Sequence, residues 1–345
     1  MSTGLKYETS DIARSIRWRV GLKRASGPME PEIHLLHRGG KTISALDWGG
    51  RNPVLLMLHA GGLCSGAFQP LALRIRHFCR PIAVDLRGHG GSSPPIKKSE
   101  FSYETLASDA LSMLDALGVQ SAYGFGHSLG GGALLRAAIK RPGFFEGLMI
   151  CEGAAAPMEP EILNRRVRGL YENAAKRRSV WLNRQELISH YRQKRPFDRF
   201  TLESLRAFAQ WGLSKREDGQ FELSCSAETE AGYHAAALWN MRADGLEQRL
   251  AEIPAAGTHC TLLRGLQSPF PEESHQAQIE ALKAESVHID AGHFLPQEEP
   301  ALVAEVIKSR MGVSPDQSGW AKRDHLQTDP VGPTHRVPNV YIDRS

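Results

Sequence analysis

Short apolar runs alternate with longer helical patterns over residues 32–154 and again over about 251–310, and this alternation constrains the fold more than any other feature of the chain. Several runs are unbroken and apolar, which is typical of strands buried on both faces of a parallel sheet. We expect strands at 33–36, 43–48, 54–58, 81–84, 122–125, 148–151, 261–263 and 287–289. Helical patterns lie at 103–117, 129–139, 275–284 and 301–310. The predicted class is α/β, with a mostly parallel eight-stranded sheet flanked by helices.

The alternation stops between residues 155 and 250, where Arg, Leu, Glu and Ala dominate. We interpret 155–250 as a helical cap inserted after the sixth strand, which leaves 32–154 and 251–311 as the core. Residues 1–31 are interpreted as an N-terminal arm, in which Ile12, Ile16 and Val20 have helical spacing. Residues 312–345 are rich in proline and poor in apolar residues, and we expect an irregular C-terminal tail.

The charge balance argues against nucleic acid as a partner. The chain has 42 basic and 38 acidic residues and a net charge of +4, which is small for a nucleic-acid-binding protein of 345 residues. Basic residues do cluster in the cap, at Arg165, Arg166, Arg168, Lys176, Arg177 and Arg178. A solvated helix face is our first interpretation of these clusters, and an anionic substrate or acidic partner is the alternative.

Cysteine usage and hydropathy favour a cytoplasmic protein without a metal or cofactor. The five cysteines are an odd number with no close pairing, as expected of reduced thiols. The chain has no CxxC or HExxH spacing, so we predict no metal site. It has no signal-peptide pattern at its start and no apolar run near the roughly 20 residues that span a bilayer. We expect a small-molecule substrate and no membrane partner, and leave homo-oligomer formation open.

The segment Gly126-His127-Ser128-Leu129-Gly130 lies between a predicted strand and a predicted helix. A sharp strand-to-helix turn of this kind displays a serine to both a substrate and a base, and its glycines avoid collisions with the adjoining strand and helix. The start of the helix also places partial positive charge next to a developing oxyanion. Ser128 is therefore the candidate nucleophile. A glycine-rich turn with a helix-capping serine is the alternative.

Four motifs in this order make residues 30–311 resemble the α/β-hydrolase superfamily. They are Leu58-His59-Ala60-Gly61-Gly62, Asp85-Leu86-Arg87-Gly88-His89-Gly90-Gly91-Ser92, the turn around Ser128, and Asp290-Ala291-Gly292-His293-Phe294. The resemblance implies an α/β-hydrolase fold with a cap. It also implies an oxyanion hole formed by the backbone N–H groups of Gly61 and Leu129, although Ala60 replaces the family's usual glycine. We expect His59 and the 85–92 loop to be structural.

His293 is the predicted general base, because it follows the last strand in a glycine-containing loop. His127 and His288 are its rivals. The acid is less obvious, since no carboxylate follows the strand at 261–263 until Glu272 and Glu273. Glu152 ends the strand next to the nucleophile strand, which resembles haloalkane dehalogenases and cofactor-free dioxygenases of the superfamily. We choose Glu152 as the acid. An N-cap or salt-bridge role for it, and Glu272 or Glu273 as the acid, are the alternatives.

A serine nucleophile disfavours dehalogenase and epoxide hydrolase chemistry, which use aspartate at this position in the superfamily. The function we expect is a serine hydrolase of the carboxylic-ester type, acting on an ester, lactone or related acyl substrate through an acyl-enzyme intermediate. A cofactor-independent oxygenase or lyase on the same residues is one alternative, and a non-catalytic ligand-binding member is the other. We expect most cap aromatic residues to form the core of the cap.

Overall fold

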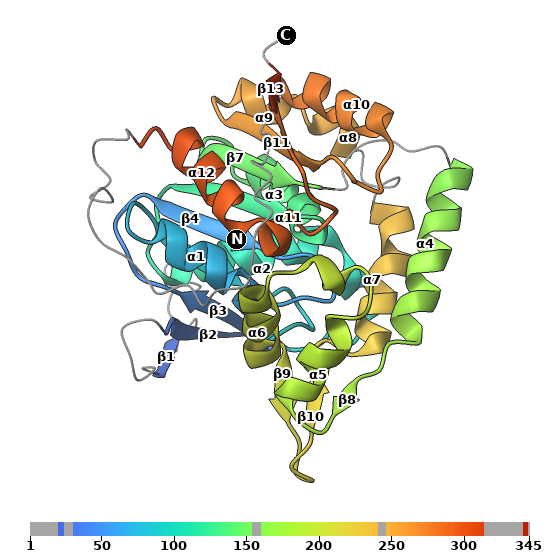
Figure 1. Cartoon of the computed structure of the whole chain (residues 1–345). Coiled ribbons are helices and arrows are strands. Elements are labelled where there is room, and N and C mark those ends of the chain that lie inside the picture. Colours follow the sequence, from blue (N-terminus) through green and yellow to red (C-terminus); the bar gives the residue numbers. More distant parts are fainter. Residues whose placement is uncertain (1–19, 24–29, 154–159, 241–245, 314–340, 344–345) are drawn as a thin grey trace, which may run out of the picture.

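The computed structural model describes residues 20–23, 30–153, 160–240, 246–313 and 341–343. In these residues a large sheet has the strand order β1-β2-β3-β5-β4-β6-β7-β11-β12-β13, with parallel strands at its centre and antiparallel ones at both edges (Figure 1). Its strands are β1 (Val20–Lys23), β2 (Glu32–Arg38), β3 (Lys41–Asp47), β4 (Val54–Leu58), β5 (Arg80–Val84), β6 (Ala122–His127), β7 (Phe145–Cys151), β11 (His259–Gly265), β12 (Glu285–Ile289) and β13 (Tyr341–Asp343).

Helices cover both faces of this sheet (Figure 1). One apolar cluster joins the sheet to α2 (Tyr103–Ala116), α3 (Leu129–Lys140), α8 (Leu246–Arg249), α9 (Glu252–Ala255) and α10 (Glu272–Leu282). A second cluster joins the other face to the 3-10 helix η2 (Ser65–Phe68), α1 (Gln69–Ile75), α11 (Leu295–Glu298) and α12 (Pro300–Arg310). Residues of β4, for example, are buried along the whole strand, because alternate side chains enter the two clusters. The α/β class and the covered, mostly parallel sheet are confirmed.

All eight predicted strands are present, and two further strands extend the sheet. β1 comes from the predicted arm and pairs with β2, whereas β13 comes from the predicted tail and pairs with β12. Irregular structure was therefore the wrong prediction for residues 341–343. The helical spacing at Ile12 and Ile16 lies outside the described residues. Three- and four-residue edge strands carry too little periodicity to be recognised in the sequence.

Residues 160–240, which make up most of the described part of the predicted cap and are called the cap below, contain more than helices. The elements of the cap are α4 (Pro160–Ala175), β8 (Val180–Trp181), α5 (Arg184–Tyr191), η4 (Phe197–Arg199), α6 (Leu202–Trp211), β9 (Leu213–Lys215), β10 (Phe221–Leu223) and α7 (Ala227–Asn240). α4 packs along α7, and α5, β8, β9 and β10 lie below the lower ends of these two helices in the view of Figure 1. The three strands form a small antiparallel sheet, which a purely helical prediction missed because each strand is only two or three residues long.

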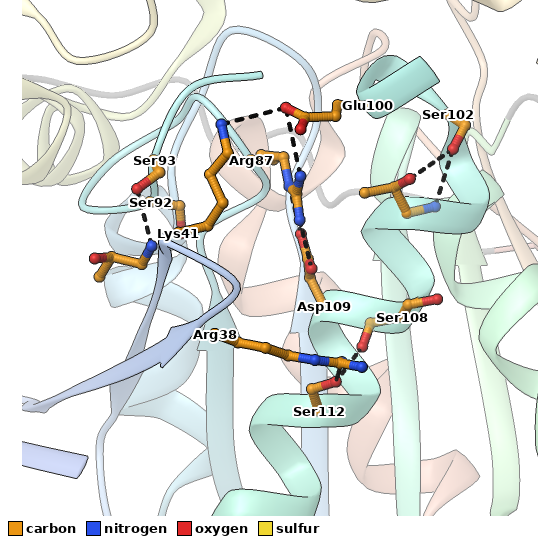
Figure 2. Close-up of polar contacts among 12 residues, drawn as sticks. Arg38, Lys41, Arg87, Ser92, Ser93, Glu100, Ser102, Ser108, Asp109 and Ser112 are labelled. Carbon is orange, nitrogen blue, oxygen red and sulfur yellow. Dashed lines mark hydrogen bonds and ion pairs between the residues drawn. The ribbon is translucent and has the colours of Figure 1, made fainter. Parts of the chain in front are cut away.

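Polar contacts fix the loop after β5 against α2 (Figure 2). The guanidinium of Arg87 donates to both carboxylate oxygens of Asp109, from Nε at 2.8 Å and from Nη2 at 3.0 Å. Glu100, in the 3-10 helix η3 (Lys98–Phe101), pairs with Lys41 at 3.3 Å and with Arg87 at 3.5 Å. These ion pairs give the predicted shape-determining loop a fixed position beside the strand ends.

The predicted site residues Gly61, Ser128, Glu152 and His293 follow β4, β6, β7 and β12, which are parallel members of the sheet. Their carboxyl ends therefore lie at one edge, where open α/β sheets bind ligands. No described helix is long and apolar enough to cross a membrane.

Candidate active site

Ser128 sits in a strained turn between β6 and α3. Its φ is +52°, in a region that non-glycine residues rarely occupy, and its side chain does not cap the helix that it precedes. Ser128 is the N-cap residue of α3, but its hydroxyl makes no capping hydrogen bond, which argues against the helix-capping alternative. A Cβ atom at Gly130 would lie 2.2 Å from the carbonyl oxygen of Leu58, so only glycine lets the turn approach β4 this closely. Backbone strain of this kind is concentrated at functional sites in proteins.

Glu152 and His293 meet at the same edge of the sheet. Glu152 Oε2 lies 3.2 Å from His293 Nδ1, and the glutamate side chain is almost fully buried, with 1% exposed. Glu152 also has a positive φ, of +51°, as the chain leaves β7. Glu272, one of the alternative acids, is 62% exposed and pairs with Arg264, while Glu273 is exposed on α10. The structure brings Glu152 to His293 and leaves the other two glutamates at the surface.

The remaining carboxylate contacts of Glu152 come from residues that the sequence analysis did not identify. The backbone N–H of Gly265 donates to Oε1 at 2.8 Å, and the hydroxyl of Ser268 donates to Oε2 at 2.6 Å. Gly265 is the last residue of β11 and Ser268 lies in the segment after it, where the usual acid position is empty. Three donors, counting His293, thus face one buried carboxylate and fix its orientation. Residues that act on a carboxylate in this way leave no motif in the sequence.

His127, a rival for the base, supports the His293 loop instead. Its Nε2 donates to the backbone carbonyl of His293 at 2.9 Å, and the two rings lie 5.3 Å apart. Burial lowers the pKa of His127 well below the usual value, so the ring is neutral. The residue before Ser128 is thereby attached to the residue that carries the candidate base. His288, the other rival, lies within β12, where its ring packs against His275.

Two backbone donors are directed to neither a side chain nor a carbonyl group. The N–H groups of Gly62, Ser128 and Gly130 all have protein acceptors, whereas those of Gly61 and Leu129 have none among the described residues. A Cβ atom at Gly61 would contact the Leu129 side chain at 3.7 Å, so the two residues are neighbours. Gly61 and Leu129 are therefore neighbours that each keep an N–H group without a protein acceptor among the described residues.

Two buried histidines fix the loop that carries Gly61. His59 Nδ1 donates to the Ala60 carbonyl at 2.8 Å, and its Nε2 accepts from Leu86 N at 3.0 Å. His89 Nε2 accepts from Gly62 N, also at 3.0 Å. Burial lowers the pKa of both imidazoles, and a neutral ring can donate from one nitrogen and accept at the other. The structural role predicted for His59 matches these contacts.

Glu298, a residue that the sequence analysis missed, holds the loop of His293 through hydrogen bonds to its backbone. Its Oε2 accepts from the backbone N–H of Gly292 at 2.7 Å, and its Oε1 accepts from that of Phe294 at 3.1 Å. The two donors flank His293 on both sides. Arg199 of the cap neutralises this buried carboxylate, with Nε 2.7 Å from Oε2. Thr201 N donates to the Gln297 carbonyl at 3.0 Å, so the cap segment 199–201 is attached to the loop of the candidate base.

A second ion pair attaches the cap to the Gly61–Gly62 loop. Arg177 pairs with Glu230 of α7 at 2.8 Å, and both side chains are largely buried. Arg177 also donates to the carbonyl of Gly62 at 3.4 Å. Gly62 has a φ of +76°, and a Cβ atom there would lie 2.5 Å from Glu230 Oε1. The cap therefore packs directly against the candidate oxyanion loop.

Most aromatic side chains of the cap form its core, as predicted. Trp181, Tyr191, Phe200 and Phe208 are buried together with Ala60 and Leu63 of the oxyanion loop segment. Tyr171, by contrast, is 46% exposed. The five cysteines are buried and unpaired, and the described residues contain no cluster of side chains suited to a metal ion.

Comparison with known proteins gives a consistent picture. A model of the alpha/beta hydrolase family matches residues 55–306. Protein phosphatase methylesterase 1 of Mus musculus is 38% identical over 104 residues, which are 27% of this chain and 25% of the methylesterase. 3-Oxoadipate enol-lactonase 1 of Acinetobacter baylyi is 31% identical over 128 residues, 36% of this chain and 47% of the lactonase. The chain thus spans between a quarter and a half of the length of these relatives.

Among solved structures, the thioesterase domain from the curacin biosynthetic pathway is similar, with a TM-score of 0.67 and 25% sequence identity. The superposition covers 81% of this chain and 99% of that domain. The similarity extends over far more of the chain than the sequence matches to the methylesterase and the lactonase do.

Proposed function

The chain belongs to the alpha/beta hydrolase family, and on this basis we propose that it is a serine hydrolase that cleaves an ester, a lactone or a related acyl substrate through an acyl-enzyme intermediate. The observation that carries the proposal is the contact between His293 Nδ1 and the buried carboxylate of Glu152, on the sheet edge where Ser128 is displayed. An empty acid position was the main reason to consider a non-catalytic member. The contact of Glu152 with His293 supports Glu152 as the acid and argues against that alternative.

In the proposed reaction Ser128 Oγ attacks the carbonyl carbon of the substrate while His293 Nε2 takes the hydroxyl proton. Glu152 accepts a hydrogen bond from Nδ1–H, which fixes the tautomer and stabilises the imidazolium that forms. The N–H groups of Gly61 and Leu129 would hold the tetrahedral oxyanion.

Collapse of this intermediate breaks the bond to the leaving alcohol, which receives the proton from His293. Water then attacks the acyl-serine ester, again with His293 as base, and releases the acid and free Ser128. Every proton that leaves a nucleophile is thus returned to a leaving group, and no cofactor enters the balance.

The family relationship and the relatives' names support ester or lactone chemistry, but they do not select a substrate. A test therefore starts with 4-nitrophenyl esters of short and medium acyl chains and a set of γ- and δ-lactones. We expect wild-type protein to cleave members of this panel, and Ser128→Ala to lose at least about 10³-fold in kcat. Absence of cleavage across the panel by folded wild-type protein contradicts the proposal. A cofactor-independent oxygenase or lyase would then be consistent with a reactive Ser128, and a ligand-binding protein with an unreactive one.

A further inference from the structure

Three arginines of the cap contact the three loops that follow β4, β11 and β12. Arg177 contacts the loop of Gly61, Arg199 the loop of His293, and Arg166 the segment after Ser268. Arg177 and Arg199 are each neutralised by a largely buried glutamate, Glu230 and Glu298 respectively. Arg166 differs from them, because no described carboxylate lies within ion-pair distance of it.

Arg166 is also unlike the other basic residues of its run. Arg165 and Arg168 are exposed on α4, as expected of a solvated helix face. The Arg166 side chain is partly buried, with its guanidinium 4.7 Å from the centre of the Phe270 ring. Burial lowers the pKa of Arg166, whereas the nearby charge of Glu152 opposes this change. Among the described side chains Glu152 forms no ion pair with Arg166, and its two oxygens accept from His293, Gly265 and Ser268 instead.

Among the described residues Arg166 has no ion-pair partner, and it lies beside the candidate catalytic residues. The Phe270 ring on which it lies also contacts the His293 ring, with 5.3 Å between centroids. A partly buried cation without a counter-ion is costly, and the cost is removed when an anion binds. Phe270 thus contacts both Arg166 and the candidate base.

The free edge of the Arg166 guanidinium has the shape of a carboxylate receptor. Only Nη1 has an acceptor among the described residues, the carbonyl of Pro269, which leaves Nε and Nη2. The same two nitrogens of Arg87 donate side by side to the two carboxylate oxygens of Asp109, at 2.8 and 3.0 Å (Figure 2). Nε and Nη2 of Arg166 can bind a carboxylate in the same way. Paired donors of this geometry bind carboxylates in bidentate fashion.

We propose that Arg166 is a specificity-determining residue that binds a carboxylate carried by the substrate, so that the protein prefers anionic acyl substrates to neutral ones. The proposal rests on the serine hydrolase function proposed above. The sequence left two interpretations open for the basic clusters of the cap. We assign the binding of an anionic substrate to Arg166, and the solvated helix face to Arg165 and Arg168.

Two matched ester pairs test the preference and locate the carboxylate. 4-Nitrophenyl hydrogen adipate and its methyl ester differ in charge on the acyl side, and 4-acetoxybenzoate and its methyl ester differ on the alcohol side. We expect kcat/KM of wild-type protein to favour one anionic ester over its neutral partner by about 10- to 100-fold. Arg166→Gln should abolish this ratio, and Arg166→Lys should retain part of it. Arg168→Gln, on the exposed face of the same helix, is the control and should keep the wild-type ratio.

Product binding separates this proposal from the proposed function. Adipate and 4-hydroxybenzoate are titrated calorimetrically into Ser128→Ala protein and into the Ser128→Ala/Arg166→Gln double variant, without any turnover. We expect the carboxylate of the preferred side to bind at least about 10-fold more weakly to the double variant. Equal ratios for charged and neutral esters in wild type and Arg166→Gln, or equal binding by the two Ser128→Ala proteins, overturn the role of Arg166. Loss of all ester cleavage with Arg166-dependent binding retained would instead overturn the hydrolase function alone.

Discussion

Replacement of Glu298 by glutamine should impair the candidate base His293, although the Glu298 side chain contacts only the backbone on either side of it. In the wild-type protein each oxygen of Glu298 accepts from one of the N–H groups that flank His293, and Oε2 also accepts from Arg199. A glutamine keeps only one oxygen. Its NH₂ group must face either a backbone N–H or the guanidinium, so a donor meets a donor and Arg199 loses its counter-charge.

The size of the effect follows from these contacts. Hydrogen bonds to a charged group contribute about 1.5 to 3 kcal/mol each, and the 36% exposure of the Arg199 side chain reduces the share of the ion pair. We expect Glu298→Gln to lower the free energy of unfolding by about 2 to 4 kcal/mol and Tm by about 3 to 6 °C. Loss of alignment between His293 and Ser128 should lower kcat by about 10- to 100-fold, while KM stays within about threefold.

The neighbouring glutamate provides a matched control. Glu299 is half-buried, and burial together with the charges of Glu298 and Asp290 raises the pKa of its carboxyl. Neutralising Glu299 removes this repulsion, so Glu299→Gln should match or slightly exceed wild-type stability and keep its kcat. Both variants are measured by thermal unfolding and by steady-state kinetics on the best nitrophenyl ester. A Glu298→Gln protein with wild-type kcat and Tm would refute the reasoning, and so would equal losses in the two variants.

Three further predictions concern the acid, the oxyanion loop and acid stability. Glu152→Gln should lower kcat by about 10² to 10⁴-fold with wild-type circular dichroism, while Glu272→Gln stays active; the opposite ranking would exclude Glu152 as the acid. Gly62→Ala should lower kcat by at least about 10-fold, because the added Cβ atom would collide with the Glu230 carboxylate. Gly169→Ala is the control, since a Cβ atom there meets no other atom, and it should keep the wild-type kcat. Equal kcat values for the two variants would contradict the close packing of Gly62 against Glu230. Burial lowers the pKa of His275 to about 4 in the folded protein, whereas the same side chain titrates near 6.5 in the unfolded chain. As pH falls below about 6.5, the unfolded chain therefore binds a proton that the folded protein does not, and the free energy of unfolding should drop by about 2 kcal/mol by pH 5. Urea unfolding at pH 7.5 and 5.0 should show a smaller drop for His275→Gln, and an equal drop would refute this assignment.

Much of the fold was predictable because its strands are buried on both faces. A strand such as β4 is then apolar at every position, and the eight strands of this kind were recognised. The strands of the cap and the two edge strands were not, because each has two to four residues and depends on tertiary pairing for its conformation. Short strands leave no periodic pattern for a sequence to show.

The candidate site was predictable where chain order and backbone geometry leave a motif. Ser128 needs glycine beside it in the turn. Glu152 was chosen because it follows β7, the strand that pairs with the nucleophile strand β6, and in the structure its carboxylate contacts His293. Ser268 and Glu298 were missed, since they act on a carboxylate and on backbone N–H groups through contacts that only the folded chain creates. Nor could the sequence separate Arg166 from the exposed Arg165 and Arg168.

Covalent labelling of Ser128 tests the central claim most directly. Folded wild-type protein is treated with a fluorophosphonate at neutral pH, digested and analysed by mass spectrometry. The account predicts one phosphonylated residue, Ser128, with labelling lost in Ser128→Ala and slowed by at least about 10²-fold in His293→Ala. Labelling at another serine, or a wild-type rate no faster than that of the His293→Ala protein, would contradict an activated serine at this turn.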